Sequence, residues 1–412
     1  MPRIIIIENK YAPGVRTRLQ ADALLRKGWE VVVLLRKSAD LSPVNDLPGC
    51  RILRVSPDIG HPLIELRRRQ LKESDAGMPR NRTAKAAFSF PSPFGQSYTL
   101  GTDLLRLESY WLEVAAEAAA HSCDVIEACD LHTLPAAVWS ADAAEDGRKI
   151  VFEARELHAE ANYIPEIYRE GWRELARTFV PRADLTISVS EEAAAIFRRR
   201  YGAANTAIVH CYPLLTGYSK RHVREWIGLD EHTPLGVHVG SIPENRHVDQ
   251  LIPLLDGLQA LHVALVGVDP ESEQFRNLLS VAVSAGVDGR LHAISPRPPE
   301  ELVSFLRSAD FGLLINPPDV DYIKLTLPNK LFDCLSAGLP MVVTEGAASA
   351  ARVSSLGAGV TFPVDEEGSL ARAVGAVLSD ETYRLAADRL RNTFDWAREC
   401  EHYVEALETL LS

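Results

Sequence analysis

Short runs of apolar residues alternate with longer amphipathic stretches along the whole chain. Several runs are apolar without interruption, as in Ile4-Ile5-Ile6-Ile7 and from Val31 to Leu35. Uninterrupted runs of this length are typical of strands that are buried on both faces, and the stretches between them fit helices. The alternation predicts an α/β protein built on parallel sheets.

The strands predicted in the first half of the chain cover residues 3–7, 30–35, 51–55, 124–128, 149–153, 185–189 and 207–210. Those predicted in the second half cover residues 235–239, 262–266, 290–294, 311–315, 339–343 and 359–362. Helices fill the gaps, for example over residues 17–27, 190–200 and 299–308.

The chain of 412 residues is too long for one ordinary core, which predicts two domains. We place the first at residues 1–212 and the second at 213–392, because Pro213 and Gly217 interrupt the periodicity within residues 210–218.

Two segments depart from the repeating pattern. Residues 393–412 predict a single amphipathic helix, whose apolar face carries Trp396, Tyr403, Val404, Leu407 and Leu411. Residues 57–98 are too long for an ordinary connection and predict an elaborated or mobile loop. This loop is basic, with seven cationic residues against three acidic ones between residues 61 and 86: Arg67, Arg68, Arg69, Lys72, Arg80, Arg82 and Lys85.

The composition narrows the class of protein. Apolar residues make up 46% and charged residues 24%, as in soluble globular proteins, and no apolar run reaches the length of a membrane span. Residues 1–30 do not resemble a signal peptide, and the six scattered cysteines lack the CxxC spacing of a zinc site. These features predict a cytoplasmic protein without a structural metal.

The charge is uneven along the chain. Residues 1–212 hold 28 basic and 28 acidic residues, whereas residues 213–412 hold 16 and 28, so the net charge of −12 lies entirely in the second half. An acidic half argues against a nucleic-acid partner.

Two loops of the second half follow predicted strands, where ligands of open α/β sheets bind. In "GSIPENRHVDQL", Gly240 allows close backbone approach and Arg246 could clamp a diphosphate, although a solvated Arg at a helix start is the simpler interpretation.

The second loop leads into "KLTLPNKLFDCLSAGLPMVVT", residues 324–344. Pro328 suits the first helical position, so the amides of Asn329 and Lys330 would point at a phosphate beyond the helix start. Asp333 lies four residues after Asn329, on the same face, and could accept hydrogen bonds from ribose hydroxyls. Gly338 would end the helix. An ordinary amphipathic helix with a surface Asp is an equally good interpretation.

The string "PNKLFDCLSAGLPMVV" resembles the donor-site motif of family 4 retaining glycosyltransferases of the GT-B fold, and "HVGSIPENRHVDQL" is similar to their glycine-containing loop. The resemblance covers both halves and is more specific in the second. It implies two Rossmann-like domains facing a central cleft, with a terminal helix that crosses back to the first domain. It also implies that Asp333 holds the ribose and Arg246 contacts the diphosphate.

Two positions depart from the family pattern. Leu325 stands at the first acidic position and Ser241 replaces an Arg. We expect Lys324, Asn329 or Lys330 to supply part of the missing role.

In the first half, "DVIEACDLHTLPAA" and "FEARELHAE" are similar to two strand-end stretches of the family. The resemblance places Asp130 and His132 at one strand end and Glu156 and His158 at another. We take His132, Asp130 and Glu156 as the candidate catalytic residues, although a core histidine is an equally good interpretation of His132. The turn "YAPGVR" could approach the diphosphate or the acceptor through Gly14, or could be a plain strand-to-helix turn.

The resemblance implies transfer of a sugar from a UDP- or GDP-linked donor to an acceptor hydroxyl, without a metal ion or cofactor and with retention of configuration. The acceptor could be a sugar, a lipid-linked or a small molecule. The basic loop could contact an anionic acceptor and the membrane surface, although a solvated loop is the simpler interpretation. Two alternatives stay open: a non-catalytic scaffold of the same fold, and a sugar-nucleotide epimerase. Oligomeric state is not indicated.

Overall fold

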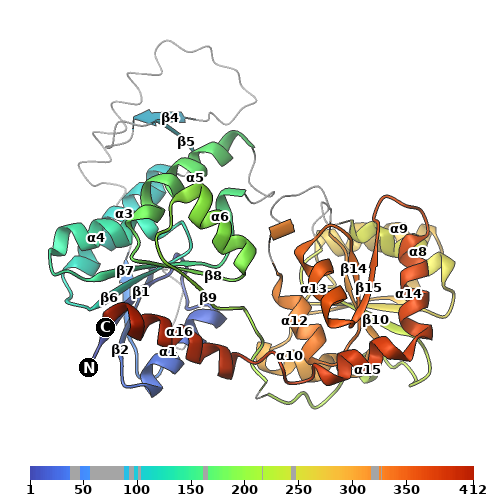
Figure 1. The fold of residues 1–412 in the computed structure, drawn as a ribbon. Helices are drawn as coiled ribbons and strands as arrows, with labels where there is room; N and C mark the ends of the chain where they lie inside the picture. Colours follow the sequence, from blue (N-terminus) through green and yellow to red (C-terminus); the bar gives the residue numbers. More distant parts are fainter. Residues whose placement is uncertain are drawn as a thin grey trace, which may run out of the picture. The chain divides into compact units, whose positions relative to one another are not determined.

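The computed structural model describes residues 1–37, 47–55, 88–91, 97–100, 104–160, 166–215, 217–242, 247–316, 324–325 and 327–412. The chain divides into two compact units (Figure 1). The first unit contains Met1–His210 together with Cys400–Ser412, and the second contains Cys211–Glu399.

The first unit is built on a seven-stranded parallel sheet with the strand order β3-β2-β1-β6-β7-β8-β9. Its strands are β1 (Arg3–Ile7), β2 (Glu30–Arg36), β3 (Arg51–Val55), β6 (Val125–Cys129), β7 (Lys149–Ala154), β8 (Leu185–Ser188) and β9 (Thr206–Ile208). Its helices are α1 (Val15–Arg26), α3 (Leu104–Ala119), α4 (Leu134–Ala144), α5 (Glu166–Phe179) and α6 (Glu191–Tyr201), with short 3₁₀ turns η3 (His158–Glu160) and η4 (Val180–Arg182).

The second unit is built on a six-stranded parallel sheet with the order β12-β11-β10-β13-β14-β15. Its strands are β10 (Leu235–Val239), β11 (His262–Val266), β12 (Leu291–Ile294), β13 (Phe311–Leu314), β14 (Met341–Thr344) and β15 (Gly359–Phe362). Its helices are α7 (Val223–Trp226), α8 (Leu251–Gly257), α9 (Glu273–Ser284), α10 (Pro299–Leu306), α12 (Asn329–Ser336), α13 (Ala348–Leu356), α14 (Ser369–Ser379) and α15 (Glu381–Arg389), with η6 (Val248–Gln250) and η7 (Asp288–Arg290).

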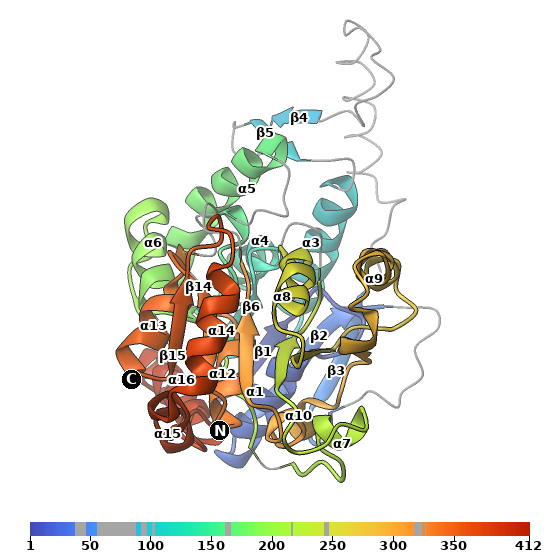
Figure 2. The same ribbon diagram turned by 90° about the vertical axis from the view of Figure 1, so that its right-hand side faces the viewer.

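Helices cover both faces of the second sheet (Figure 2), and successive strand residues feed two separate cores. On β14, Met341 and Val343 join the core beneath α10, α12 and α13, whereas Val342 joins the core beneath α8, α9 and α14. A strand that buries both faces needs an uninterrupted apolar run, which is the pattern seen in the sequence.

Helix α16 (Trp396–Leu411) begins in the second unit and ends in the first. Tyr403, Val404 and Leu407 are buried, and Trp396 is buried as well, whereas Leu411 is 37% exposed. The predicted apolar face is therefore correct for four of its five residues. In the first unit α16 lies beside α1, as Figure 1 shows.

All thirteen predicted strands are present, with ends that differ from the prediction by at most two residues. The α/β class is confirmed. Within the segment predicted as a loop over residues 57–98, the structure has a short antiparallel pair, β4 (Phe88–Pro91) with β5 (Ser97–Leu100). The seven basic residues of that segment lie outside the described residues. Among the helices that the structure describes, none has the length and apolar character needed to cross a membrane.

Candidate functional site

In the second unit, the carboxyl ends of β10 and β13 are neighbours, because the two strands pair in parallel. Helix α12 follows β13 and leads back to the start of β14, so its amino end lies at this same edge of the sheet. Ligands of open α/β sheets bind at such an edge. Gly240, which follows β10, and Asn329, which begins α12, therefore lie at the same edge of the sheet.

The first turn of α12 begins at Asn329, with Pro328 as the N-cap residue (φ −73°, ψ 144°). The sequence predicts Pro328 as the first helical residue, but its extended ψ angle makes it the N-cap residue, whose carbonyl accepts from the Leu331 amide at 3.0 Å. A proline offers no capping side chain, and the first turn carries no acidic residue. The positive end of the helix dipole is thus not neutralised by a cap or by a first-turn carboxylate.

Aromatic packing fixes α12 in place. The Phe332 ring lies 4.8 Å from Tyr212 and 5.1 Å from Phe394, between ring centroids. The predicted stop at Gly338 is also observed, since Gly338 adopts φ 79° and an added Cβ there would meet the Arg391 side chain at 2.2 Å.

Asp333 is half-buried on the second turn of α12. Burial raises the pKa of its carboxyl group to about 7. Of the other predicted residues, Lys324 and Asn329 are exposed, Lys330 is buried and Leu325 is half-buried. The structure thus brings Asn329, Lys330 and Asp333 together on one short helix.

Gly240 ends β10 with φ 92°, a backbone conformation that other residues rarely adopt. Its amide donates to the Val266 carbonyl at 2.7 Å, and a Cβ added at Gly267 would lie 3.3 Å from the Gly240 Cα. Two glycines therefore allow the ends of β10 and β11 to approach closely. Ser241 is exposed, and Arg246 lies outside the described residues.

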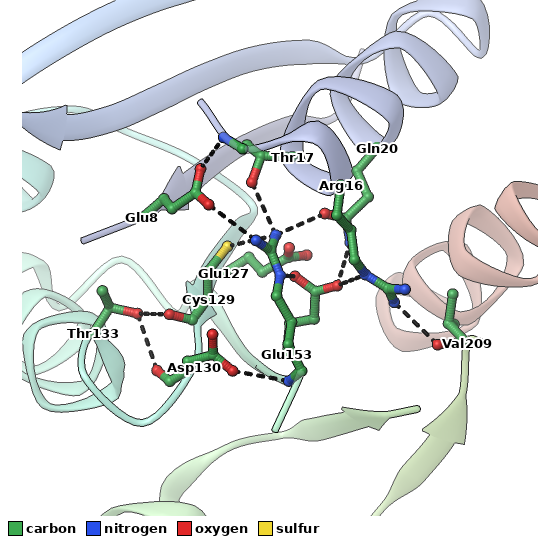
Figure 3. A network of polar contacts seen from close by, with 12 residues as sticks. Glu8, Arg16, Thr17, Gln20, Glu127, Cys129, Asp130, Thr133, Glu153 and Val209 are labelled. Atoms are coloured by element: carbon green, nitrogen blue, oxygen red, sulfur yellow. Dashed lines mark hydrogen bonds and ion pairs between the residues drawn. The ribbon is translucent and has the colours of Figure 1, made fainter. Parts of the chain in front are cut away.

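The corresponding edge of the first unit is occupied by a charge network that the sequence did not reveal (Figure 3). At its centre the Arg155 guanidinium contacts Glu8 Oε1 at 3.0 Å and Glu153 Oε2 at 2.7 Å. It also donates to the Thr17 hydroxyl, the Gln20 amide oxygen and the Cys129 sulfur. These groups come from β1, α1, β6 and β7, which parallel pairing brings together.

Glu8 occupies the amino end of α1. Its Oε2 atom accepts from the Gly14 amide at 2.9 Å, and its Oε1 atom lies 2.9 Å from Lys10 Nζ. The pKa of Glu8 is lowered, because the Arg155 charge and the Gly14 hydrogen bond outweigh the effect of burial. The proposed role of Gly14 in ligand binding stays a prediction.

Glu153 is fully buried and binds a second guanidinium, that of Arg16, together with the Gln20 side-chain amide at 2.7 Å. Next to it, Glu127 accepts from the Tyr403 hydroxyl of α16 at 2.7 Å. Glu127, Cys129 and Glu153 lie close enough together to hold a metal ion. The positive charge of Arg155, 2.7 Å from Glu153 and 3.2 Å from Cys129, already fills that role.

Asp130 follows β6 directly and adopts φ 64°. Its Oδ1 atom accepts from the Arg155 amide at 2.9 Å, which joins the ends of β6 and β7. Burial raises the pKa of Asp130 to about 7, despite the nearby Arg155 charge.

His132 packs in a cluster of three rings. Its centroid lies 4.0 Å from that of His158 and 4.8 Å from that of Trp172. Burial lowers the pKa of His132 to about 4, and burial with the neighbouring His132 lowers that of His158 to about 3. Both imidazoles are therefore neutral at pH 7. Glu156, the third predicted catalytic residue, is exposed.

Several charged residues of this edge were missed by sequence reasoning, notably Glu8, Arg16 and Glu153. The signal available was their position, since each lies at or just beyond the end of an apolar strand or at the start of the helix that follows.

No family model matches the chain. A curated relative, D-inositol 3-phosphate glycosyltransferase from Nocardia farcinica, is 26% identical over 253 residues, which are 57% of this chain and 54% of the relative. The match thus spans about half of that relative's length.

The likeness to solved structures extends over the whole chain. Sucrose-phosphate synthase from Thermosynechococcus elongatus has a TM-score of 0.71 and 16% identity, covering 100% of this chain and 99% of that one. The fold is GT-B. The structure of Anabaena HepE in complex with UDP-glucose is similar as well, with a TM-score of 0.69 and 15% identity, covering 99% of this chain and 100% of that one. The resemblance to GT-B glycosyltransferases that the sequence indicated is confirmed at the level of the fold.

Proposed function

We propose that this GT-B protein is a retaining glycosyltransferase that moves a sugar from a UDP- or GDP-linked donor to an acceptor hydroxyl. One observation carries the proposal: helix α12 begins at the carboxyl edge of the second sheet without an acidic first turn, and presents Asp333 one turn later. A helix tip suits a diphosphate, and a carboxylate suits a pair of ribose hydroxyls.

The donor would be held by its nucleotide. The amide groups at the start of α12 and the side chains of Lys324, Lys330 and Arg246 would meet the diphosphate, while Gly240 would let it approach the backbone. A curated relative that is named a glycosyltransferase, and a similar fold observed with UDP-glucose, support a donor of this class.

The reaction breaks the bond between the sugar's anomeric carbon and the diphosphate oxygen, and forms a bond from that carbon to the acceptor oxygen. The diphosphate leaves with the electron pair, and the acceptor's proton passes to it or to water. Cations and a helix tip stabilise the departing charge without a metal ion. His132 is neutral at pH 7, so it would orient the sugar or the acceptor by hydrogen bonds, with Asp130 and Glu156 nearby in the sequence as further candidates.

The acceptor side lies in the first unit under this proposal. The basic segment between residues 61 and 86 would favour an anionic acceptor, and we propose a cytoplasmic enzyme that contacts the inner face of the membrane when the acceptor is lipid-linked. Neutralising its seven cationic residues should weaken acceptor use while leaving donor binding unchanged.

Donor binding is the direct test. A panel of UDP- and GDP-linked sugars should raise the unfolding temperature of the full chain, since a ligand that binds only the folded state stabilises it. Asp333→Ala should abolish this shift, whereas Asp256→Ala, an exposed carboxylate on α8 of the same unit, should leave it intact.

The outcomes separate the alternatives. A non-catalytic scaffold need bind no nucleotide sugar. An epimerase would bind its sugar nucleotide but convert the sugar without transferring it, so release of free UDP or GDP in the presence of an acceptor separates it from a glycosyltransferase. A full thermal shift in Asp333→Ala would place the donor elsewhere and defeat the proposal.

A further inference from the structure

Arg36 is the last residue of β2 and lies at the carboxyl edge of the first sheet. Its amide donates to the Lys10 carbonyl at 2.9 Å, which ties it to the loop after β1. The side chain is half-buried. An arginine in this position stands where a ligand of an open sheet would bind.

Two tyrosine rings hold the Arg36 guanidinium. Its Cζ atom lies 5.6 Å from the centroid of Tyr11 and 5.2 Å from that of Tyr110. Tyr11 is 49% exposed and Tyr110 is fully buried, so one ring faces solvent and the other anchors the site. Rings at these distances stabilise a cation and restrict its orientation, but they do not neutralise its charge.

Arg36 has neither a carboxylate nor a hydrogen-bond acceptor for its guanidinium anywhere in the part of the chain that the structure describes. Its Nε atom is buried and unsatisfied. A buried donor without a partner is costly, and native structures seldom keep one without a reason. The orientation given by the two tyrosines leaves the group available to an anion.

The other arginines of this edge behave differently. Arg16 and Arg155 both bind Glu153, and Arg155 binds Glu8 as well. Glu8, which also accepts from Gly14 and Lys10, has no direct contact with Arg36. The carboxylates of the edge are therefore used by other groups.

Further positive charge lies beside Arg36. Lys37 is the next residue and is exposed, and its amide donates to Val55 at the end of β3. Arg54 donates from Nη1 to the Tyr11 carbonyl at 2.8 Å. The ends of β2 and β3 thus gather three cations, which suits a dianion such as a phosphate monoester better than a single carboxylate.

We propose that Arg36, together with Lys37 and Arg54, forms a binding site for a phosphate group carried by the acceptor. That this ligand is the acceptor rests on the proposed function, whereas phosphate binding itself does not. The planar guanidinium donates in pairs to phosphate oxygens, and Tyr11 and Tyr110 hold it at a fixed angle.

A continuous set of contacts joins this site to the predicted catalytic edge. The Tyr110 hydroxyl donates to the Glu8 carbonyl at 3.3 Å, the Glu8 carboxylate binds Arg155, and the Arg155 amide binds Asp130. The phosphate site and the end of β6 therefore belong to one rigid edge, so an acceptor bound at Arg36 has a defined position relative to Asp130 and His132.

The test measures binding of inorganic phosphate to the full chain by phosphorus NMR, with UDP present in excess to occupy the second unit. Arg36→Gln should weaken phosphate binding by about 10- to 100-fold, as expected for loss of charge-assisted hydrogen bonds. Arg36→Lys keeps the positive charge but lacks the planar guanidinium, so it should weaken phosphate binding less than Arg36→Gln does. The matched control is Arg26→Gln on α1, which loses an exposed pair with Asp22 and should bind phosphate like the wild type.

Two further arms identify the source of the phosphate. One arm compares binding of glucose 6-phosphate with binding of glucose. The other compares binding to phosphatidylglycerol vesicles with binding to phosphatidylcholine vesicles. Binding that depends on Arg36 in either arm supports the site and identifies its ligand class. Thermal unfolding checks that the variants are folded. Equal phosphate binding by wild type and Arg36→Gln, or binding by neither, overturns the proposal.

The two proposals fail separately. Phosphate binding that depends on Arg36 in a protein that binds neither UDP nor GDP would keep the site and reject the glycosyltransferase. Nucleotide-sugar binding that depends on Asp333, without phosphate binding at Arg36, would keep the proposed glycosyltransferase and reject the phosphate site.

Discussion

The carboxyl edges of the two sheets share one architecture, but they differ in whether a carboxylate of the protein binds the helix that begins there. In the first unit the helix after the first strand, α1, starts at Gly14, whose amide binds the Glu8 carboxylate at 2.9 Å. In the second unit α12 starts after Pro328 with no acidic residue in its first turn. The first helix tip binds a carboxylate of the protein itself, whereas the second has no capping side chain and no acidic residue in its first turn.

This difference teaches why two similar folds within one chain can have different ligands. A carboxylate bound to a helix tip excludes a phosphate from the same place by repulsion and by occupying the donors. The Arg155 pair then keeps Glu8 ionised, with a lowered pKa. The comparison supports a binding site for the nucleotide-sugar donor in the second unit. In the first unit, Arg36 is the cation that we propose binds an anionic ligand.

The largest expected effect comes from removing the centre of the first edge. Arg155→Met leaves Glu8 and Glu153 buried without their shared cation, which should destabilise the fold by about 3–5 kcal/mol. Urea unfolding of the full chain measures the change. Arg182→Met, which breaks only a surface pair with Asp142, should cost about 1 kcal/mol or less. Equal losses of stability in the two variants would show that the network stabilises the fold no more than an exposed ion pair does.

A smaller effect is expected from the pH dependence of the second edge. Ribose hydroxyls donate to an ionised carboxylate, and burial raises the pKa of Asp333 to about 7. The ionised fraction rises between pH 6 and pH 8, so the affinity for UDP should increase by about tenfold over that range. Calorimetry at the two pH values measures it.

Asp333→Asn is the control for this pH series, because its side chain does not titrate. Any pH dependence that the variant retains belongs to the phosphate groups of UDP. A wild-type increase no larger than that of the variant would remove Asp333 from the site.

The smallest effect concerns the C-terminal helix. Burial, with the charge of Glu153, raises the pKa of Glu127 to about 8, so at pH 7 the Tyr403 hydroxyl binds a predominantly neutral acid. Tyr403→Phe should therefore cost about 1 kcal/mol at pH 7. Because the folded pKa lies above the unfolded one, stability should fall as the pH rises toward 9.

At pH 9 Glu127 is ionised, and the same hydroxyl then binds a charge, so the cost of Tyr403→Phe should grow. Urea unfolding at both pH values provides the comparison. In the Glu127→Gln background the cost should be independent of pH; a constant cost in the wild-type background would contradict the raised pKa.

The sequence predicted the sheets well because a buried parallel strand leaves a purely local mark. Runs such as Ile4-Ile5-Ile6-Ile7 need no knowledge of distant residues. The predicted start of α12 is one residue early, because a proline is compatible with either the N-cap or the first turn and only its ψ angle decides between them.

The charge network could not be predicted in the same way. Glu8 follows β1, whereas Glu127 lies on β6 and Glu153 on β7. Arg155, which pairs with Glu8 and Glu153, lies two residues beyond Glu153. Only strand order and register, which depend on the whole sheet, bring them together.

Helix α16 has a consequence for synthesis on the ribosome. The first unit needs Tyr403, Val404 and Leu407 for its packing, yet 189 residues of the second unit separate His210 from Cys400. At typical elongation rates of about 5–20 residues per second, the nascent first unit waits roughly 10 to 40 s for this helix. During that interval an apolar surface beside α1 is uncovered, and it is a natural place for a chaperone to bind.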